Sequence, residues 1–335
     1  MAGPLKGYRV LDMSRILAGP WAGQLLADLG ADVVKIERPG CGDDTRHWGP
    51  PYLKDQDGNE TEDAAYFFCA NRGKKSVTID ITRSEGQDII RQLALQSDVL
   101  IENYKVGGLA KYGLDYSALK KINPKLIYCS ITGFGQTGPY ANRPGYDFLI
   151  QGMGGLMSIT GEPDSPDNKT AGPVKVGVAV TDLFTGLYAA NAIQGALLER
   201  HQSGVGQYID LALLDVQAAV LANQASNYLI GNLVPERLGN AHPNIVPYQA
   251  FATADSHIII AVGNDQQFAR FCKVIESPLM AEDPLYASNA NRVNNRQVLC
   301  DSISVSLRQK DSLHWLAAFE ANDVPCGPIN SIDQV

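Results

Sequence analysis

The sequence has few cysteines, and their spacing excludes two common kinds of framework. No CxxC pair occurs among the six, which are Cys41, Cys69, Cys129, Cys272, Cys300 and Cys326. A disulfide scaffold needs a dense paired set, and a structural zinc site needs closely spaced ligands. The spacing of His47, His201 and His257 does not supply such ligands either. We therefore expect free thiols in a reducing compartment and no metal site.

Long apolar runs and basic clusters are also missing. No apolar stretch approaches the roughly 18 residues that a membrane span needs. A strand pattern follows MAGPLKG directly, which leaves no room for a signal or transit peptide. The net charge is −8 without basic runs, and binding to nucleic acid or anionic membranes depends on clustered Lys and Arg. We expect a cytoplasmic protein with neither kind of partner.

The first half of the chain alternates short β-branched segments with amphipathic helical segments. Hydrophobic residues make up 45% of the 335 positions, enough to bury the cores of about two domains. Strand and helix in alternation predict an α/β fold with a parallel sheet covered on both faces. The segments are residues 8–14, 19–30, 32–37, 76–81, 84–96, 98–103 and 125–134.

The second half begins with a Gly/Pro/Asp-rich loop at residues 160–173. A long helical pattern then runs from Leu183 to about Gln202, followed by a strand at 206–213 and a helix to about Ile230. The composition from residue 231 onward is that of a linker, and a new strand pattern begins at His257. We predict a large domain over residues 1–230, and a linker with a smaller α+β domain over 231–335.

The end of the second predicted strand carries an acid and a base, Glu37 and Arg38. An acid there can bind a ribose hydroxyl in dinucleotide-binding folds, but the first turn has no GxGxxG fingerprint. Arg38 suits a phosphate, since a guanidinium holds phosphate through paired N–H groups. The alternative for Arg38 is a solvated charge at a strand end.

Other cations lie beside the predicted ends of neighbouring strands, where ligands bind in open α/β sheets. A polyphosphate carrying an adenine would use such charges together with flanking groups such as Ile79 and Tyr104. Scattered lysines on a solvated face are the alternative. The residues are Arg72, Lys74, Lys75, Lys105 and Lys111.

Asp182 stands among small residues just before the long helix, and two roles fit it. Aspartate is a favoured helix N-cap, and its charge suits the positive end of the helix dipole. The small neighbours Gly177, Ala179 and Gly186 would also admit a bulky thioester, with backbone N–H groups at the helix start to bind an oxyanion. The two roles are compatible. No Ser-His-Asp or Cys-His set competes, and His242 reads as a loop hydrogen-bonding residue.

Several motifs together resemble the class III CoA-transferases along the whole chain. They are LDMSRILAGPWAGQLLADLGADVVKIERPGCGDDTRHWGPPY, NRGKKS, ENY, SITGFGQTGPYANRPGYD, GVAVTDLFTG, ERHQSGVGQYIDLALLD and HPNIVPYQAF. The resemblance implies a Rossmann-like large domain, a small domain and an interlocked homodimer. It also implies CoA as co-substrate with no further cofactor.

The resemblance implies a role for individual residues. The family's nucleophile falls on Asp182. Its CoA contacts fall on Leu17, Ala18, Arg38, Ile79, Asp80, Ile81, Thr82, Asn103, Tyr104, Lys105 and Lys111. Family members often have a basic residue where Thr82 stands, although Arg83 is adjacent. Members also run on for about sixty residues that return to the large domain, and this sequence lacks them.

The implied reaction moves CoA from an acyl-CoA to a carboxylic acid through an aspartyl anhydride and an aspartyl-CoA thioester. Within the family, the chain most resembles members that act on succinate and glutarate. The segments that carry this likeness are GDDTRHWGPPY, YCSITGFGQTGP, NYLIG and VPYQAF. This places succinyl-CoA and short dicarboxylates first. Two alternatives stay open. An α-methylacyl-CoA racemase would need a histidine where Tyr146 stands, and tyrosine is a poor base near pH 7. A non-catalytic CoA-binding protein would not need Asp182.

Overall fold

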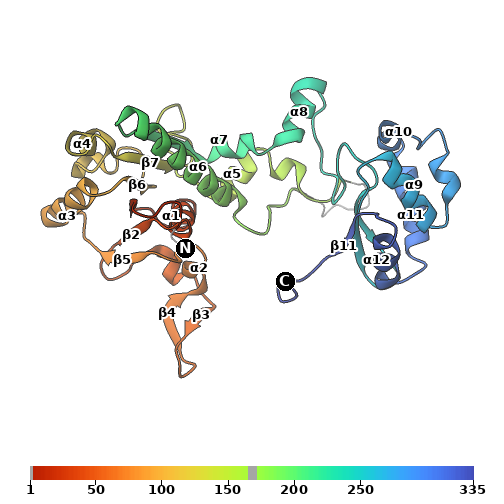
Figure 1. The fold of residues 1–335 in the computed structure, drawn as a ribbon, viewed down its shortest axis with the longest axis horizontal. Helices are drawn as coiled ribbons and strands as arrows, with labels where there is room; N and C mark the ends of the chain where they lie inside the picture. Colours follow the sequence, from red (N-terminus) through yellow and green to blue (C-terminus); the bar gives the residue numbers. More distant parts are fainter. Residues whose placement is uncertain (1–2, 165–171) are drawn as a thin grey trace. The chain divides into compact units, whose positions relative to one another are not determined.

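The chain divides into two compact units in the computed structural model, which describes residues 3–164 and 172–335 (Figure 1). Unit 1 comprises Met1–Met157 and Lys175–Ala225, and unit 2 comprises Ser158–Val174 and Ser226–Val335. The predicted division at residue 230 leaves residues 158–164 and 172–174 with the first part of the chain, whereas the structure groups them with unit 2. Residues 165–171 of the predicted loop lie outside the described residues.

A six-stranded sheet forms the centre of unit 1, and all its neighbouring strands are parallel. The strand order is β5-β2-β1-β6-β7-β8, so the order reverses between β1 and β6. The strands are β1 (Arg9–Asp12), β2 (Asp32–Glu37), β5 (Lys75–Thr78), β6 (Val99–Glu102), β7 (Ile127–Thr132) and β8 (Tyr208–Ala212). This confirms the predicted α/β class with a parallel sheet.

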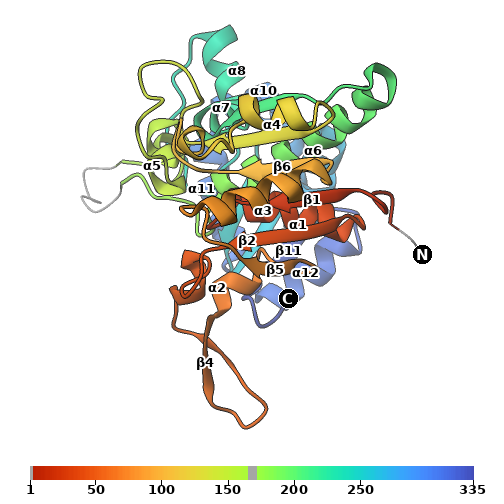
Figure 2. The same ribbon diagram turned by 90° about the vertical axis from the view of Figure 1, so that its left-hand side faces the viewer.

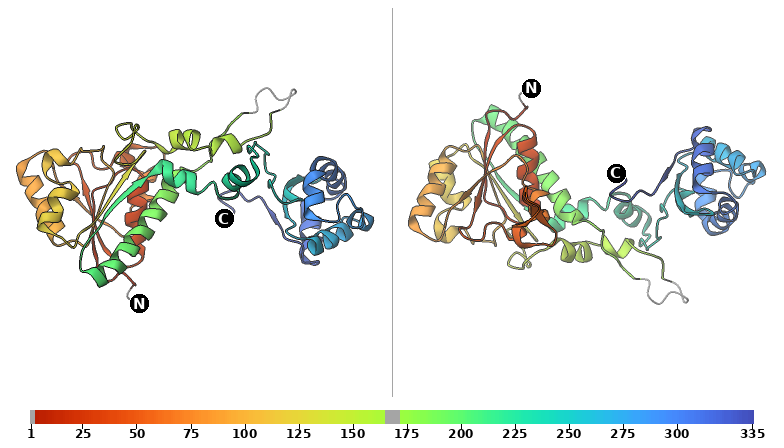
Figure 3. Two further views of the ribbon diagram at one scale, coloured as in Figure 1. Left: turned by 90° about the horizontal axis from the view of Figure 1, so that it is seen from above. Right: turned by 90° about the horizontal axis from the view of Figure 1, so that it is seen from below.

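Helices cover both faces of this sheet, as Figure 2 and Figure 3 show. Val10 packs into a core with α1 and α6, and its neighbour Leu11 packs into a second core with α3 and α4. Buried residues on both faces explain the near-continuous apolar strands. The helices of unit 1 are α1 (Ala18–Asp28), α2 (Ala65–Phe68), α3 (Ser84–Leu95), α4 (Tyr116–Ile122), α5 (Asp147–Met153), α6 (Val180–Ser203) and α7 (Leu213–Ala219). Helix α8 (Ala222–Gly231) begins in unit 1 and continues into unit 2.

Smaller elements complete unit 1. An antiparallel hairpin of β3 (Tyr52–Lys54) and β4 (Glu60–Ala64) extends away from the sheet in Figure 2. Short 3₁₀ turns lie at η1 (Asp44–His47) and η2 (Ala110–Tyr112), and η3 (Met157–Ile159) begins at the last residue of this stretch of unit 1 and continues into unit 2. The hairpin and these turns connect the main elements and do not extend the sheet.

Unit 2 has its own apolar core around a three-stranded antiparallel sheet of order β11-β10-β9. Alternate residues of β10, Ile258 and Ile260, point into this core beside Phe268 and Phe271. The elements are β9 (Tyr248–Ala252), β10 (His257–Ala261), α9 (Asp265–Val274), η4 (Pro278–Ala281), α10 (Asn289–Asn294), α11 (Arg296–Leu307), α12 (Ser312–Glu320) and β11 (Cys326–Pro328).

Each of the six cysteines is a free thiol. Within the described ranges, no helix is both long and apolar enough to cross a membrane, and no cluster of His, Cys, Asp or Glu side chains is arranged to hold a metal ion.

Candidate functional site

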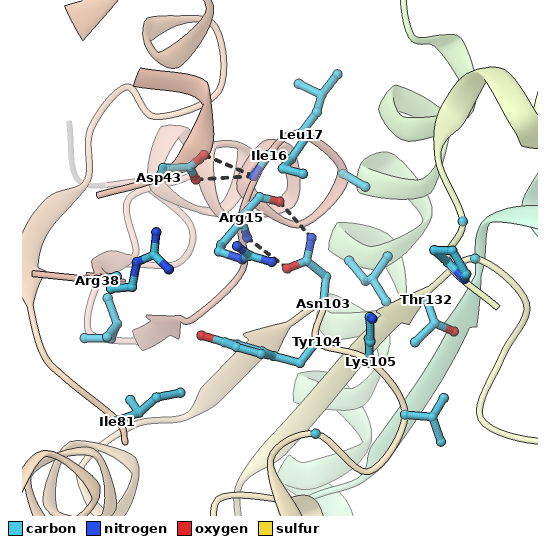
Figure 4. Close-up of a pocket in the computed structure, with 18 of the residues that line it drawn as sticks. Arg15, Ile16, Leu17, Arg38, Asp43, Ile81, Asn103, Tyr104, Lys105 and Thr132 are labelled. Atoms are coloured by element: carbon cyan, nitrogen blue, oxygen red, sulfur yellow. Dashed lines mark hydrogen bonds between the residues drawn. The ribbon is translucent and has the colours of Figure 1, made fainter. Parts of the chain in front are cut away.

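A pocket of about 520 Å³ opens in unit 1 at the carboxyl ends of the parallel strands (Figure 4). The segments that follow β5, β2, β1, β6 and β7 line it, together with the start of α6 and α7. The pocket therefore spans the point between β1 and β6 where the strand order reverses, which is where open α/β sheets bind ligands. Its volume is in the range of small-molecule sites, about 300–1,000 Å³.

Every site residue that the family resemblance implies lines this pocket. They are Leu17, Ala18, Arg38, Ile79, Asp80, Ile81, Thr82, Asn103, Tyr104, Lys105, Lys111 and Asp182. The structure thus brings together residues that are far apart in the chain, since Leu17 and Asp182 are separated by 165 positions. Their individual roles stay predictions.

Two of the cations that line the pocket, Arg38 and Lys111, are unpaired among the described residues. Arg38 is exposed, and its Nε donates to Cys41 Sγ at 2.6 Å. Figure 4 shows the Tyr104 hydroxyl directed toward the space between Arg38 and Ile81. Lys111 Nζ lies 4.6 Å from the centre of the Tyr112 ring. Neither cation forms an ion pair with a described carboxylate, so both are available to an anionic ligand.

Thr82 does not contribute a charge here, and the adjacent Arg83 does not replace one. The Thr82 hydroxyl donates to Asp80 Oδ1 at 2.6 Å. Arg83 pairs with the other oxygen of Asp80 at 3.4 Å and does not line the pocket.

Three cations that the sequence analysis places beside the pocket pair with carboxylates and do not line it. The pairs are Arg72 with Asp28 at 2.5 Å, Lys74 with Asp12 at 2.8 Å and Lys75 with Asp32 at 2.6 Å. That expectation is wrong because these residues precede β5 or begin it. The ligand-binding edge of a parallel sheet is at the other end of the strand.

Glu37 is not available to a ribose hydroxyl. Its oxygens accept hydrogen bonds from the Arg46 guanidinium, the Ser76 hydroxyl and the Asp43 amide, at 2.6–2.8 Å. Burial alone would raise the pKa of Glu37, but these bonds lower it to about 2. A dinucleotide site would need both the glycine fingerprint, which the sequence lacks, and a free acid at this position. Neither is present, so the structure does not support dinucleotide binding.

The loop between β1 and α1 is held by two side chains (Figure 4). The Asn103 amide accepts from the Arg15 N–H at 2.9 Å and donates to the Arg15 carbonyl at 2.7 Å. The Asp43 carboxylate accepts from the Ile16 N–H at 3.3 Å. Ile16 has a φ of +71°, which a β-branched residue rarely adopts. These bonds stabilise the strained loop at the pocket wall, and they occupy the Asn103 amide.

Asp182 does not cap the long helix, contrary to the expected capping role. Helix α6 begins at Val180, three residues earlier than predicted, and Ala179 is its N-cap. Asp147 Oδ1 accepts from the amides of Thr181 at 2.8 Å and Asp182 at 3.3 Å. A carboxylate from α5 therefore does the capping, and the Asp182 carboxylate has no hydrogen-bond partner among the described residues.

The Asp182 carboxyl group is harder to ionise in this site than it would be in water. Burial, with the nearby Asp147 charge, raises the pKa of Asp182 to about 7. An aspartate in water has a pKa of about 3.9 and is fully ionised at neutral pH, whereas Asp182 is only partly ionised there. Tyr66, on α2, lies close enough for the Asp182 charge to act with burial in raising the tyrosine pKa to about 12.

The backbone amides at the start of α6 are occupied, whereas two at the start of α1 are free among the residues that the structure describes. The amides of residues 180–183 all donate within unit 1. The amides of Ala18 and Gly19 have no acceptor in the described part of the chain.

A Cβ at Gly186 would lie 2.8 Å from the Ala18 carbonyl oxygen, so α1 begins against the second turn of α6. Gly186 therefore serves the close packing of these helices.

Sequence reasoning missed four residues at this site. Arg15 and Arg143 line the pocket, Asp147 accepts a hydrogen bond from the Asp182 amide, and Tyr66 lies close enough to Asp182 for that charge to help raise the tyrosine pKa. Asp147 and Arg143 both belong to the quoted motif SITGFGQTGPYANRPGYD, which the analysis used only for the resemblance. Tyr146, where a racemase would need histidine, is exposed and lines the pocket.

Comparisons with known proteins identify the family of this chain. The sequence profile of the family described as CoA-transferase family III matches residues 5–335. The succinate–glutarate CoA-transferase of Agrobacterium fabrum is 55% identical over 332 residues, 99% of this chain and 81% of that protein. The human succinyl-CoA:glutarate CoA-transferase is 46% identical over 332 residues, 99% of this chain and 73% of that protein.

A solved structure shows the same fold. The CAIB/BAIF family protein from Brucella suis superposes with a TM-score of 0.86 at 52% identity, covering 100% of this chain and 86% of that one. CoA is the co-substrate of this family, and its members act on an acyl-CoA and a carboxylate. The chain is an enzyme that transfers CoA, and it belongs to family III of the CoA-transferases.

Proposed function

We propose that this enzyme moves CoA from succinyl-CoA to a short dicarboxylate such as glutarate, with Asp182 as its covalent nucleophile. The observation that carries the proposal is the free Asp182 carboxylate at the wall of the pocket that the predicted CoA contacts line. The names of the Agrobacterium and human relatives support the acid pair.

Four displacements complete the reaction. Asp182 attacks the thioester carbon, a C–O bond forms, the C–S bond breaks and CoA thiolate leaves. The thiolate then attacks the Asp182 carboxyl carbon, and the donor acid leaves as its carboxylate. The acceptor carboxylate attacks the resulting Asp182 thioester and again releases thiolate. The thiolate finally attacks the acceptor carbonyl, which restores the Asp182 carboxylate with no net gain or loss of protons.

The raised pKa of Asp182 helps the first displacement. An ordinary carboxylate with a pKa of about 3.9 is far less basic than a thiolate with a pKa of about 8.5, so its attack on a thioester is uphill. A carboxylate with a pKa of about 7 lies closer to the thiolate in basicity. The site gains nucleophilicity at the cost of having part of the enzyme protonated at neutral pH.

CoA lies along the edge of the sheet in this proposal. Its phosphates contact Arg38 and Lys111, and its adenine lies against Tyr104 and the segment Ile79–Thr82. Its thioester reaches Asp182, where the free amides of Ala18 and Gly19 bind the developing oxyanion. Residues 1–230 form the CoA-binding domain in this assignment, and residues 231–335 the linker and smaller domain.

The proposed assembly is an interlocked homodimer in the cytoplasm. Large apolar side chains are exposed around the start of α6 and on α5, including Phe148, Leu149, Val178, Phe184 and Leu187. Exposed apolar side chains that gather in one region are typical of an interface. The free thiols support a reducing compartment.

The test is an assay of succinyl-CoA against a panel of acids, with the product thioesters separated and quantified. We expect glutarate and similar dicarboxylates to form CoA esters at least tenfold faster than formate or other monocarboxylates. The Asp182→Asn variant should form none. Faster transfer to monocarboxylates would contradict the substrate class, and transfer by the variant would contradict the mechanism.

A further inference from the structure

Arg143 is a pocket-lining cation that the proposed roles leave unassigned. It is exposed, and its guanidinium has no ion pair and no hydrogen bond to residues 3–164 or 172–335. The guanidinium carbon lies 4.6 Å from the centre of the Tyr140 ring and 5.6 Å from that of Phe134. The two rings pack edge to face at 5.5 Å. The aromatic pair therefore supports a guanidinium whose N–H donors remain free.

Arg143 belongs to the end of the pocket that contains Asp182. Its loop is packed tightly onto the end of β7, because a Cβ at Gly133 would lie 2.5 Å from the Cα of Gly145. Four residues after Arg143, the Asp147 carboxylate binds the amides of Thr181 and Asp182. The same short segment thus holds Arg143 at the pocket and fixes the start of α6.

The other arginines of the pocket are either paired with a carboxylate or far from the end of β7. Arg15 pairs with Asp44 at 2.8 Å. Arg38 follows β2, which is three strand spacings from β7, a separation of about 14 Å. Lys105, in the segment that follows β6, is a competing cation, and Figure 4 shows it between Tyr104 and Thr132.

On the basis of the proposed function, we propose that Arg143 binds the second carboxylate of the dicarboxylate acid, and so determines the preference for dicarboxylates over monocarboxylates. One carboxyl group of the acid reacts at Asp182, and the other needs a cation a few carbon atoms away. A guanidinium suits it better than an ammonium group, because its N–H fork matches both carboxylate oxygens.

The test is a competition between two acceptor acids in one reaction. Glutarate and valerate have the same chain length, and a methyl group replaces the second carboxylate in valerate. With succinyl-CoA as common donor, the initial ratio of glutaryl-CoA to valeryl-CoA reports the ratio of the two kcat/KM values. The ratio does not depend on the donor step or on the fraction of active enzyme.

We expect Arg143→Gln to lower this ratio about ten- to a hundredfold, the range expected for one hydrogen-bonded charged contact. Arg143→Lys keeps the charge and should restore most of the preference. Arg38→Ala and Lys105→Met are the matched controls. Both should slow the reaction through weaker CoA binding while leaving the ratio at the wild-type value.

An unchanged ratio in Arg143→Gln would overturn the inference, and so would a collapse of the ratio in Lys105→Met alone. Both results require a wild type that prefers glutarate. A wild-type enzyme that forms neither ester, or that forms both equally, would instead contradict the proposed function. The two failures are therefore distinguishable in the same experiment.

Discussion

The Asp147 carboxylate accepts hydrogen bonds from the backbone amides of Thr181 and Asp182, at 2.8 Å and 3.3 Å, and so caps the helix that carries Asp182. Two carboxylates therefore lie near the start of α6, Asp147 from α5 and Asp182 from α6 itself, and they have different roles. Asp147 satisfies the orphan amides of the first turn, which leaves the Asp182 side chain without a structural bond. Burial raises the pKa of Asp182, and the negative charge of the nearby Asp147 raises it further.

This arrangement predicts a pH dependence of the first chemical step. Only the ionised Asp182 can attack, so its rate should fall about tenfold per pH unit below an inflection near 7 and reach a plateau above it. Asp147→Asn keeps an oxygen that accepts from the helix amides but removes the charge, so the inflection should move to lower pH. Single-turnover release of CoA thiol from succinyl-CoA, measured from pH 5 to about 9, gives the profile.

The Asp147→Asn variant also separates charge from capping. Its unfolding midpoint in urea should stay close to that of the wild type, because Asn and Asp are equivalent caps. An inflection that stays near 7 in this variant would show that the Asp147 charge does not act on Asp182.

Arg38→Ala should raise the KM for acyl-CoA about ten- to a hundredfold, because a charge-assisted contact to phosphate is lost. The KM for the acceptor acid should change far less. Arg83→Ala is the matched control, since Arg83 pairs with Asp80 and does not line the pocket. Steady-state kinetics with both substrates varied decide the matter. Equal effects of the two substitutions would remove Arg38 from the CoA site.

A buried ion pair behind the pocket predicts a large stability effect. Lys35 Nζ lies 2.8 Å from Asp43 Oδ2, and both side chains are almost fully buried. Asp43→Ala leaves the Lys35 charge uncompensated and also frees the Ile16 amide, so the free energy of unfolding should fall by about 3–5 kcal/mol.

The exposed pair Arg72–Asp28 is the control for this effect. Arg72→Met should change the free energy of unfolding by less than about 1 kcal/mol, as exposed pairs do. Urea denaturation of the three proteins compares them. A loss below about 1 kcal/mol in Asp43→Ala would show that the buried pair does not stabilise the loop at Ile16.

The sheet and its ligand-binding edge were predictable from the sequence because apolar periodicity and strand–helix alternation are local signals. Strands such as β2 and β7 bury both faces, and their apolar runs express this directly. The set of residues around the pocket was also predictable, although that set came from the family resemblance and not from periodicity.

The state of Asp182 was not predictable, because it depends on partners that are distant in sequence. Aspartate at a helix start reads as a cap, and nothing local shows that Asp147, 35 positions earlier, takes that role. Pairing of Lys74 with Asp12 and occupation of Glu37 by Arg46 likewise depend on tertiary contacts. Charge in the sequence predicts the presence of cations but not which of them remain free.

Covalent trapping tests the central claim most directly. The wild type is incubated with succinyl-CoA and no acceptor, treated with hydroxylamine or borohydride, digested and examined by mass spectrometry. We predict modification of the peptide at Asp182 and no modification in Asp182→Asn, which should still fold and bind CoA. Modification at another residue, or transfer by Asp182→Asn at the wild-type rate, would contradict the account.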